Sequence, residues 1–401
     1  MANPGLRQEI DPMVLTQVVR RMLQQPSADL TTWQIAPLGY AALSQVTGGV
    51  FRVMGHVQYE RTSMPWSVIL KIVHPPADSE GLLGAFLGRT DDPSHYNYWQ
   101  REPLIYQAGL LSNLPGGIVA PKCFGITEQP NERVWLWLED IADQYGRQWP
   151  LARYGLAAHH LGKFNGAYLA GRQPLPSAPW LTTQIARKWA VGVDTVVTSV
   201  RDRVQHPAAW AHPIVQQRLP PGWVEGVLQF WDAREQYLRT MDELPQTFCH
   251  HDALQPNLFA RHVNGAAQTV AIDWAFAGMG VVGEDLAQLV HGSMFYRPDV
   301  AAEASRLEDL AFDQYVSGLR SVGYQGDPQL VRLGYVLSTA IRWGFWGLFW
   351  LHHALREAQP SEDDQRQAHM LAERVEHLTS VITFTLRILD EARMLAGTRH
   401  P

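Results

Sequence analysis

The residues whose types suit chemistry are grouped late in the chain. Asp252 and Asn257 are five residues apart, and Asp273 follows sixteen residues later, after an apolar stretch. A hairpin with its turn at Asn264 and Gly265 would fold Asp273 back beside Asn257. Asparagine and carboxylate oxygens are hard ligands that suit Mg²⁺ when it also bridges substrate phosphates. Asp252 then remains free to act on an incoming hydroxyl, so the pattern predicts phosphoryl transfer.

The neighbouring His250 and His251 suggest a zinc site as an alternative. Structural and catalytic zinc sites draw several ligands from positions at characteristic spacing. Here the two histidines are adjacent, Cys249 stands alone, and no second ligand pair occurs at such a spacing. The sequence therefore argues against zinc. A serine hydrolase is disfavoured too, because the chain has no Gly-x-Ser-x-Gly motif.

Phosphoryl transfer also requires a cation on the phosphates. Lys71 is the candidate, since it stands alone among the apolar residues 66–73. A lysine in such a strand is often an edge residue whose ammonium reaches water, so that alternative stays open. Glu102 lies at a suitable distance downstream to hold Lys71, although a solvated helix residue is an equal alternative. Pro103 indicates that Glu102 sits in the first turn of its helix, where proline is tolerated.

The elements that must position these residues change in kind along the chain. Residues 11–25 predict a helix with Asp11 as N-cap and Pro12 in its first turn. The following part is β-rich up to residue 138. The predicted strands cover residues 32–39, 50–59, 66–73, 118–127 and 133–140. One predicted helix, over residues 96–111, interrupts them.

From residue 142 onward the periodicity is helical. The predicted helices cover residues 151–171, 222–241, 301–321, 328–355 and 362–395. A single β-type island, residues 247–276, lies among them and reads as loop, strand, turn, strand and loop. A β-rich N-terminal part therefore meets a helical C-terminal part that carries the candidate catalytic residues.

In this order, the features resemble the aminoglycoside phosphotransferase and choline-kinase-like branch of the protein-kinase-like fold. The resemblance covers roughly residues 35–291. The residues that carry it are Lys71, Glu102, the segment 136–141, His250 with Asp252 and Asn257, Asp273 with Trp274, and the segment 280–290. Each motif alone is weak, but the first five of these in the right order make a specific pattern, to which the segment 280–290 adds.

The resemblance implies an α+β, two-lobed protein-kinase-like fold, with a small antiparallel-sheet N-lobe and a larger, mostly helical C-lobe. Residues 1–30 would form an N-terminal helical extension. Residues 31–141 would form the nucleotide-binding N-lobe, which ends in a hinge. Residues 142–401 would form the C-lobe, with the catalytic loop, the metal site and the acceptor site.

The resemblance also implies roles for individual residues. Asp252 would orient or deprotonate the acceptor hydroxyl, and Asn257 and Asp273 would hold Mg²⁺. Lys71 would contact the α- and β-phosphates of ATP or GTP and pair with Glu102.

The family's nucleotide-binding and bracing positions match further residues. The backbone at Leu138, Glu139 and Asp140 would form the hinge that hydrogen-bonds adenine. His250 would brace the catalytic loop, and Asp285 would brace the helical lobe.

A glycine-containing turn at residues 44–51 would cover the phosphates in such a fold. Its candidate contacts are Ser44, Thr47, Gly48 and Gly49. The two glycines let backbone N–H groups approach a phosphate. Such a pair also serves simply to join two strands, and both interpretations stay open.

The chain departs from the family's pattern in three places. His251 occupies a middle position that is commonly Gly or Asn in the family but varies across the wider fold. Gln255 replaces a frequent histidine at a position not required for metal binding. The residues after Asp273 read Trp-Ala-Phe-Ala instead of the commoner Trp-Glu. The last difference removes a charge near the metals, so the acceptor cannot be carried over from relatives.

The bulk composition is that of an ordinary globular protein, with 46% hydrophobic and 18% charged residues among 401. A net charge of −6 and the lack of a basic run argue against a nucleic-acid partner. No uncharged run reaches the ~18 apolar residues of a membrane helix, and the first residues do not read as a signal peptide. Cys123 and Cys249 are far apart, which predicts no disulfide framework and a reducing, cytoplasmic location. The oligomeric state is left open.

Two other functions compete with a small-molecule kinase. A catalytically silent pseudokinase would bind nucleotide or act as a scaffold, but such proteins typically lack one of the four functional positions that Lys71, Asp252, Asn257 and Asp273 fill here. A kinase-fold enzyme that transfers a nucleotidyl group or modifies a protein is the second alternative. The resemblance favours a small-molecule hydroxyl acceptor, such as an aminoglycoside-, sugar- or choline-like compound or another natural product.

The chain has 15 tryptophans, and many aromatic residues fall in its C-terminal half. Residues 341–357 and the surroundings of Trp189 and Trp231 would lie on the acceptor side of this fold. Aromatic walls suit apolar or glycosidic ligands, or a quaternary amine through cation–π contact. Helix packing is the alternative, since aromatic residues dominate core burial. No acceptor follows from the sequence.

Overall fold

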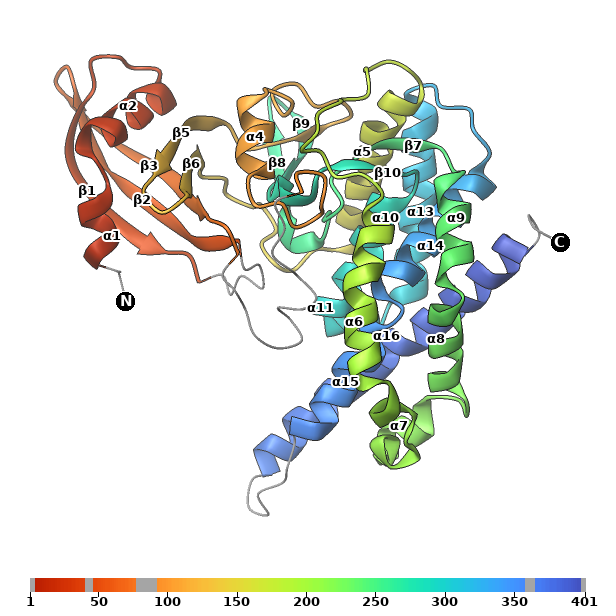
Figure 1. The fold of residues 1–401 in the computed structure, drawn as a ribbon. Coiled ribbons are helices and arrows are strands. Elements are labelled where there is room, and N and C mark those ends of the chain that lie inside the picture. Colours follow the sequence, from red (N-terminus) through yellow and green to blue (C-terminus); the bar gives the residue numbers. More distant parts are fainter. Residues whose placement is uncertain (1–3, 40–45, 77–91, 358–364, 398–401) are drawn as a thin grey trace.

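The computed structural model of the chain describes residues 4–39, 46–76, 92–357 and 365–397. A five-stranded sheet with two short helices forms one end of the molecule, and the rest is mostly helical with two small sheets (Figure 1). The predicted α+β class is therefore confirmed, with its small antiparallel-sheet lobe and its larger helical lobe.

The sheet of the small lobe is antiparallel and has the order β1-β2-β3-β6-β5. Its strands are β1 (Asp29–Pro37), β2 (Thr47–Tyr59), β3 (Thr62–Val73), β5 (Cys123–Gln129) and β6 (Arg133–Glu139). The prediction of one strand over residues 118–127 was wrong. Its first part forms β4 (Ile118–Val119), which pairs in parallel with β9 (Ala266–Ala271) of the large lobe. Pro121 lies between β4 and β5 and has no N–H to continue a ladder.

Two helices cover one face of this sheet, α1 (Pro4–Glu9) and α2 (Pro12–Leu23). The predicted cap of α2 is present, because the Asp11 carboxylate accepts the backbone N–H of Met13 at 2.8 Å. Leu70 and Ile72 of β3 pack in the same apolar cluster as these helices. Since side chains alternate along a strand, Lys71 points to the opposite face.

Helix α4 (Arg101–Gln107) is much shorter than the predicted helix over residues 96–111. The guanidinium of Arg101 donates hydrogen bonds to the backbone carbonyls of Pro93, His95 and Tyr96. The residues before α4 form turns that direct these carbonyls to Arg101, so the helix does not extend back to residue 96. At the other end, Gly109 adopts a positive φ of 69° and ends the helical path. Glu102 lies in the first turn, as predicted.

The large lobe is built around one extended apolar core. Its helices are α5 (Leu151–Leu169), α6 (Ile185–Gln205), α7 (Pro213–Arg218), α8 (Trp223–Asp232), α9 (Arg234–Asp242), α10 (Glu284–Ala287), α11 (Ser293–Tyr296), α12 (Pro298–Ala301), α13 (Ala304–Ser321), α14 (Pro328–Trp343), α15 (Trp346–Glu357) and α16 (Gln365–Gly397). Short 3₁₀ segments are η1 (Pro207–Trp210), η2 (Gln255–Asn257) and η3 (Trp274–Phe276), and η4 (Gln288–Gly292) is a short π-helix. No helix among the described residues combines the length and the apolar character that crossing a membrane requires.

Two predicted helices are divided in the structure. Residues 222–241 form α8 and α9, which meet at Ala233. Residues 328–355 form α14 and α15, with a break at Gly344 and Phe345. Glycine is a poor helix former, and the periodic apolar pattern continues across the break, so the pattern alone does not reveal it.

The predicted hairpin joins β8 (Leu258–Val263) to β9, with Asn264 and Gly265 both at positive φ in the turn. The first segment of the β-type island 247–276 was predicted as a loop, and this was wrong in part, because it begins within β7 (Gln246–Cys249). Strand β7 pairs antiparallel with β10 (Gly278–Val281), which follows the island, with Gly278 opposite Cys249. The loop 250–257 and Asp273 therefore lie between the β7–β10 pair and the β8–β9 pair. These two pairs fix the loop and Asp273 relative to each other.

Candidate active site

The loop that follows β7 is anchored by a buried carboxylate. Asp285, at the start of α10, accepts the backbone N–H of His250 at 3.1 Å and that of His251 at 2.8 Å. The side chain of Asn165 in α5 donates to the same carboxylate at 3.1 Å. Asp285 is fully buried, so these hydrogen bonds are made away from water and hold the loop firmly. Asp285 thus lies where the predicted bracing residue should.

His250 links the loop to the strand that leads to Asp273. Its Nε2 lies 2.9 Å from the carbonyl of Ile272, and its Nδ1 lies 3.2 Å from the N–H of Asp252. Burial lowers the pKa of His250, which favours the neutral ring with one donor and one acceptor nitrogen. The ring also packs against Trp274, with 4.5 Å between centroids. Both nitrogens are occupied, so the imidazole braces the loop and is not free to ligate zinc.

Asp252 and Asn257 face each other across the loop. The Asn257 amide nitrogen donates to the Asp252 carbonyl at 3.0 Å and to its carboxylate Oδ2 at 2.7 Å. This arrangement turns the Asn257 amide oxygen away from Asp252, as a metal ligand requires. Burial raises the pKa of Asp252 to about 7, and the nearby charge of Asp273 adds to the rise. The raised pKa suits a group that accepts a proton near neutrality.

Lys71 lies between two carboxylates that come from different elements. Its Nζ is 2.5 Å from Glu102 of α4 and 2.8 Å from Asp273, which follows β9. The Lys71 and Glu102 side chains are 9% and 2% exposed, against 23% for Asp273. Burial alone would lower the pKa of Lys71, but attraction to Asp273 and Glu102 outweighs it and raises the pKa, so the ammonium stays charged. The edge-lysine and solvated-glutamate alternatives do not describe these two buried side chains.

The site has more negative than positive charge around Asp273. The Lys71 charge lowers the pKa of Asp273 in spite of its burial, and the resulting carboxylate raises the pKa of Asp252. A divalent cation held by the oxygens of Asp273 and Asn257 would relieve this repulsion, so the donor set fits Mg²⁺. Within the described residues, no group of three or more His, Cys, Asp or Glu side chains could hold a metal ion. A Mg²⁺ site here would therefore be completed by water and phosphate oxygens.

The turn before β2 is described only in part. Ser44 lies outside the described residues. Thr47 begins β2 opposite Val73, and the strand bulges before Gly49. A side chain at Gly48 would come within 2.9 Å of the His74 ring, and Gly49 has a φ of 147°. The bulge accounts for both glycines structurally, which leaves their contact with phosphate a prediction.

The three hinge residues lie at the end of β6. Leu138 is buried among apolar side chains. The Glu139 carboxylate accepts the N–H of Lys122 at 3.1 Å and pairs with Arg261 at 2.9 Å. The Asp140 carboxylate accepts two hydrogen bonds from Arg52, at 2.7 and 3.0 Å, and one from Ser67 at 2.5 Å. Both acidic side chains are thus used to fix the strand end, so adenine would have to be bound by backbone groups.

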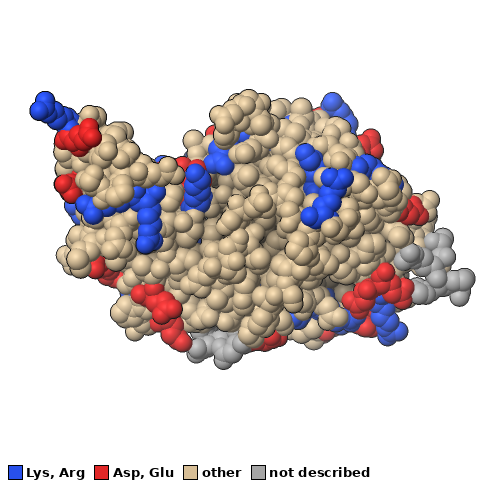
Figure 2. Space-filling view, turned by 90° about the horizontal axis from the view of Figure 1, so that it is seen from above, with Lys and Arg blue, Asp and Glu red and all other residues tan. Residues whose placement is uncertain are grey.

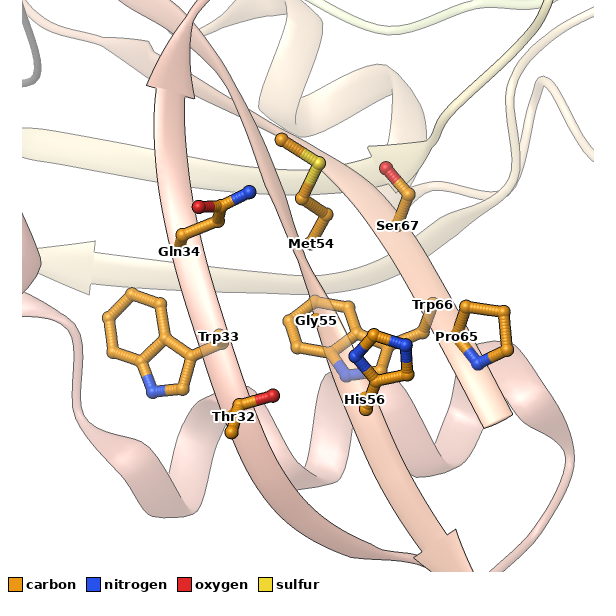
Figure 3. Close-up of a pocket in the computed structure, with 9 residues that line it drawn as sticks. All are labelled: Thr32, Trp33, Gln34, Met54, Gly55, His56, Pro65, Trp66 and Ser67. Carbon is orange, nitrogen blue, oxygen red and sulfur yellow. The ribbon is translucent and has the colours of Figure 1, made fainter. Parts of the chain in front are cut away.

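A pocket with a volume of about 550 Å³ lies elsewhere on the small lobe, across β1, β2 and β3 (Figure 3). Trp33 and Trp66 flank Gly55 there, where a side chain would collide with the carbonyl of Thr32 1.9 Å away. None of the predicted site residues lines this pocket. Seen from above, the surface is also hollowed between the small lobe and the large lobe (Figure 2).

Two arginines near the site were missed by the sequence analysis. Arg342 of α14 is buried, donates to the carbonyl of His251 at 3.3 Å and lies 4.3 Å above the Trp189 ring. Its charge opposes the rise in the pKa of Asp252. Arg101, next to Glu102, donates to the carbonyl of Ala275 at 2.7 Å. Helix α14 carries two arginines in its apolar pattern, Arg332 and Arg342, and this was the available signal for Arg342, whereas nothing in the sequence singles out Arg101.

The aromatic residues were expected either to pack in the core or to line the acceptor side. Trp135, Trp137, Trp231 and Trp274 are less than 2% exposed and belong to the core. Trp231 therefore packs in the core, and its indole nitrogen donates to Asp194 at 2.9 Å, while the position of this stretch on the acceptor side stays a prediction. Trp189, by contrast, packs beside Arg342, whose charge acts on Asp252.

A model of the phosphotransferase enzyme family matches residues 107–321. The match covers more than half of the chain and includes Asp252, Asn257, Asp273 and Asp285. The chain belongs to this family, and the prediction of a phosphotransferase enzyme is confirmed. Lys71 and Glu102 lie before the matched residues, so their assignment rests on the geometry of the small lobe.

Several solved structures of kinases are similar to this chain. An amicoumacin kinase in complex with AMP-PNP, Ca²⁺ and Ami has 12% identity, covers 92% of this chain and 96% of its own, and has a TM-score of 0.46. A microcompartment-associated aminopropanol kinase has 12% identity, covers 95% and 98%, and has a TM-score of 0.49. An ethanolamine kinase of Plasmodium vivax has 10% identity, covers 92% and 86%, and has a TM-score of 0.44. No curated protein matches the chain.

Proposed function

We propose that this protein transfers the γ-phosphoryl group of ATP or GTP to a hydroxyl group of a small molecule. The observation that carries the proposal is the junction of Lys71 with Glu102 and Asp273, made from three separate elements. A buried lysine with two carboxylates is costly to assemble, because each charge loses its hydration. The nearby Asp252 and Asn257 also support the proposal, because phosphoryl transfer uses a cation, metal ligands and a base together.

The nucleotide would be held by the small lobe. Lys71 has three N–H donors and directs two of them to Glu102 and Asp273, which leaves one for the α- and β-phosphates. The backbone at Leu138, Glu139 and Asp140 would bind the base. The turn with Ser44, Thr47, Gly48 and Gly49 would cover the phosphates; here the backbone N–H groups are the proposed donors.

Asn257 and Asp273 would hold Mg²⁺, which when bound neutralises charge on the phosphate oxygens. Asp252 would accept a hydrogen bond from the acceptor hydroxyl and orient it. As the acceptor oxygen forms its bond to the γ-phosphorus, the bond to the bridging oxygen of the nucleotide breaks and Asp252 takes the hydroxyl proton. His250 and Asp285 would keep Asp252 in position by holding the backbone of its loop.

The wider organisation belongs to the proposal as well. Residues 1–30 would form an extension, residues 31–141 the nucleotide-binding lobe and residues 142–401 the catalytic and acceptor lobe. Lys and Arg lie in separate groups with Asp and Glu among them on the face in Figure 2, in keeping with a small-molecule partner and not a nucleic acid. A cytoplasmic location agrees with the two free cysteines, Cys123 and Cys249.

A product screen tests the proposed activity. The protein is incubated with Mg²⁺, either ATP or GTP, and pooled sugars, amino alcohols and aminoglycosides, and products are followed by mass spectrometry. The expected result is one acceptor that gains the mass of a phosphate with matching loss of the nucleotide's γ-phosphate. Nucleotide binding without any phosphorylated product, in pools that also include peptides, would instead favour the pseudokinase alternative.

A further inference from the structure

Arg101 is a buried cation whose surroundings are unusual. It is 0% exposed, and its guanidinium donates five hydrogen bonds, all to backbone carbonyls of described residues. Burial lowers the pKa of Arg101 to about 9, which still leaves it charged at neutral pH. A buried guanidinium normally has a carboxylate as its partner, and here five carbonyl dipoles take that place.

The carbonyls come from three segments of the chain. Three of them, including Tyr96 at 2.8 Å, precede α4. The fourth is Trp180, at 2.7 Å, which lies between α5 and α6 in the large lobe. The fifth is Ala275, at 2.7 Å, two residues after Asp273. The planar fork of arginine can therefore fix the beginning of α4 to two separate parts of the large lobe at once.

Glu102 holds the same segment from the next position along α4. Its carboxylate pairs with Lys71, which in turn pairs with Asp273. Consecutive residues of α4 thus act on the segment at Asp273, Glu102 through Lys71 and Arg101 through the carbonyl of Ala275. Helix α4 is in direct contact with η3, the segment that follows Asp273.

The segment at Asp273 needs such support. Asp273 has φ 62° and ψ 63°, a left-handed conformation that non-glycine residues rarely adopt. Strained conformations of this kind persist only where their surroundings hold them. The carbonyl of Ala275, which Arg101 holds, lies two residues after Asp273. Arg101 therefore acts on the backbone that presents Asp273.

We propose that Arg101 is a positioning residue that keeps α4 attached to the large lobe and holds Asp273 in its left-handed conformation, so that Lys71, Glu102 and Asp273 are assembled before nucleotide binds. This inference rests on the proposed function for its catalytic meaning. Arg101 does not contact nucleotide or acceptor in this account. It acts through the Asp273 backbone and through Glu102.

Amide hydrogen exchange on the protein without nucleotide tests the assembly. Arg101→Met removes all five hydrogen bonds, and Arg101→Lys keeps the charge but offers at most three donors. Arg332→Met is a matched control, because Arg332 is a largely buried arginine that pairs with Glu308 and Glu391, away from this site. Exchange at Trp274 and Ala275 is expected to quicken at least tenfold in Arg101→Met and less in Arg101→Lys. In Arg332→Met it is expected to stay unchanged.

The second readout is the Mg²⁺ concentration that gives half-maximal phosphoryl transfer at saturating nucleotide. We expect it to rise at least tenfold in Arg101→Met, partly recover in Arg101→Lys and stay at the wild-type value in Arg332→Met. Unchanged exchange at Trp274 and Ala275 in Arg101→Met would overturn the proposal, as would an unchanged Mg²⁺ requirement. If Arg101→Met does not fold, Arg101→Lys decides by the same criteria. The exchange measurement needs no activity, so an inactive wild-type protein would count against the proposed function alone.

Discussion

Replacing Lys71 by methionine tests how the charged junction contributes to stability. Lys71→Met keeps much of the side-chain volume but removes the positive charge between Glu102 and Asp273. Because the Glu102 side chain is 2% exposed, its charge cannot be hydrated in place of the lost partner. Removing one partner of a buried pair costs about 3–5 kcal/mol. We expect the free energy of unfolding to fall by about that amount, and nucleotide affinity to fall with it.

A double-mutant cycle with Glu102→Gln isolates the pair. Glu102→Gln alone leaves Lys71 paired with Asp273 at 2.8 Å, so it should cost less than Lys71→Met. In the double variant the amide replaces the unpaired carboxylate. The cost of the double variant should therefore be smaller than the sum of the single costs by about 1–3 kcal/mol.

Denaturant unfolding at fixed pH and salt measures all four proteins. Arg306→Met serves as the control, because Arg306 pairs with Glu303 at the surface, where the side chains are 76% and 45% exposed. Such pairs contribute about 0–1 kcal/mol. If Lys71→Met cost no more than Arg306→Met, or if the two single costs simply added, the buried junction would not exist in solution as described.

Three further predictions concern the loop, the metal and a buried histidine. Asp285→Asn removes an acceptor oxygen from the backbone N–H groups of His250 and His251; kcat should fall at least tenfold with nucleotide affinity retained, and equal kcat would contradict the bracing role. Asn257→Ala should raise the Mg²⁺ requirement of the reaction more than tenfold, whereas an unchanged requirement would remove Asn257 from the metal site. His291 is buried against Thr385, and burial lowers its pKa to about 3. The unfolded chain then binds the extra proton below about pH 6.5, so His291 stabilises the fold fully above that pH and loses this contribution as the pH falls toward 3. Between pH 6.5 and 4, the free energy of unfolding of the wild type should fall with decreasing pH by up to about 1.4 kcal/mol per pH unit more than that of His291→Gln. Identical pH dependence of the two proteins would refute this.

The sequence predicted those parts of the site whose position depends on local structure. Asp11 caps a helix, and Asn264 with Gly265 forms a hairpin turn. Both features could be predicted because each depends on residues that are neighbours in the sequence. The same hairpin returns Asp273 toward Asn257, which the spacing alone indicated. The family's order of motifs supplied Lys71 and the two lobes, which no local pattern could have joined across 202 positions.

The features that were missed depend on contacts between distant segments. Helix α4 begins later than predicted because the segment before it forms turns whose carbonyls accept hydrogen bonds from Arg101. Ile118 belongs to a different sheet from the strand that follows, because its partner is Thr269. Arg342 reaches His251 from a helix that reads as apolar. In each case a long-range partner overrides the local preference, and periodicity carries no information on which partner that is.

The most direct test of the central claim is phosphoryl transfer by Asp252→Asn. Transfer from γ-labelled ATP or GTP to the identified acceptor is measured beside nucleotide binding, with Asp390→Asn as a control at an exposed aspartate. The account predicts that Asp252→Asn loses turnover by at least a hundredfold while it binds nucleotide nearly as the wild type does. Asp390→Asn should behave as the wild type in both assays. Transfer by Asp252→Asn at the wild-type rate would contradict the account.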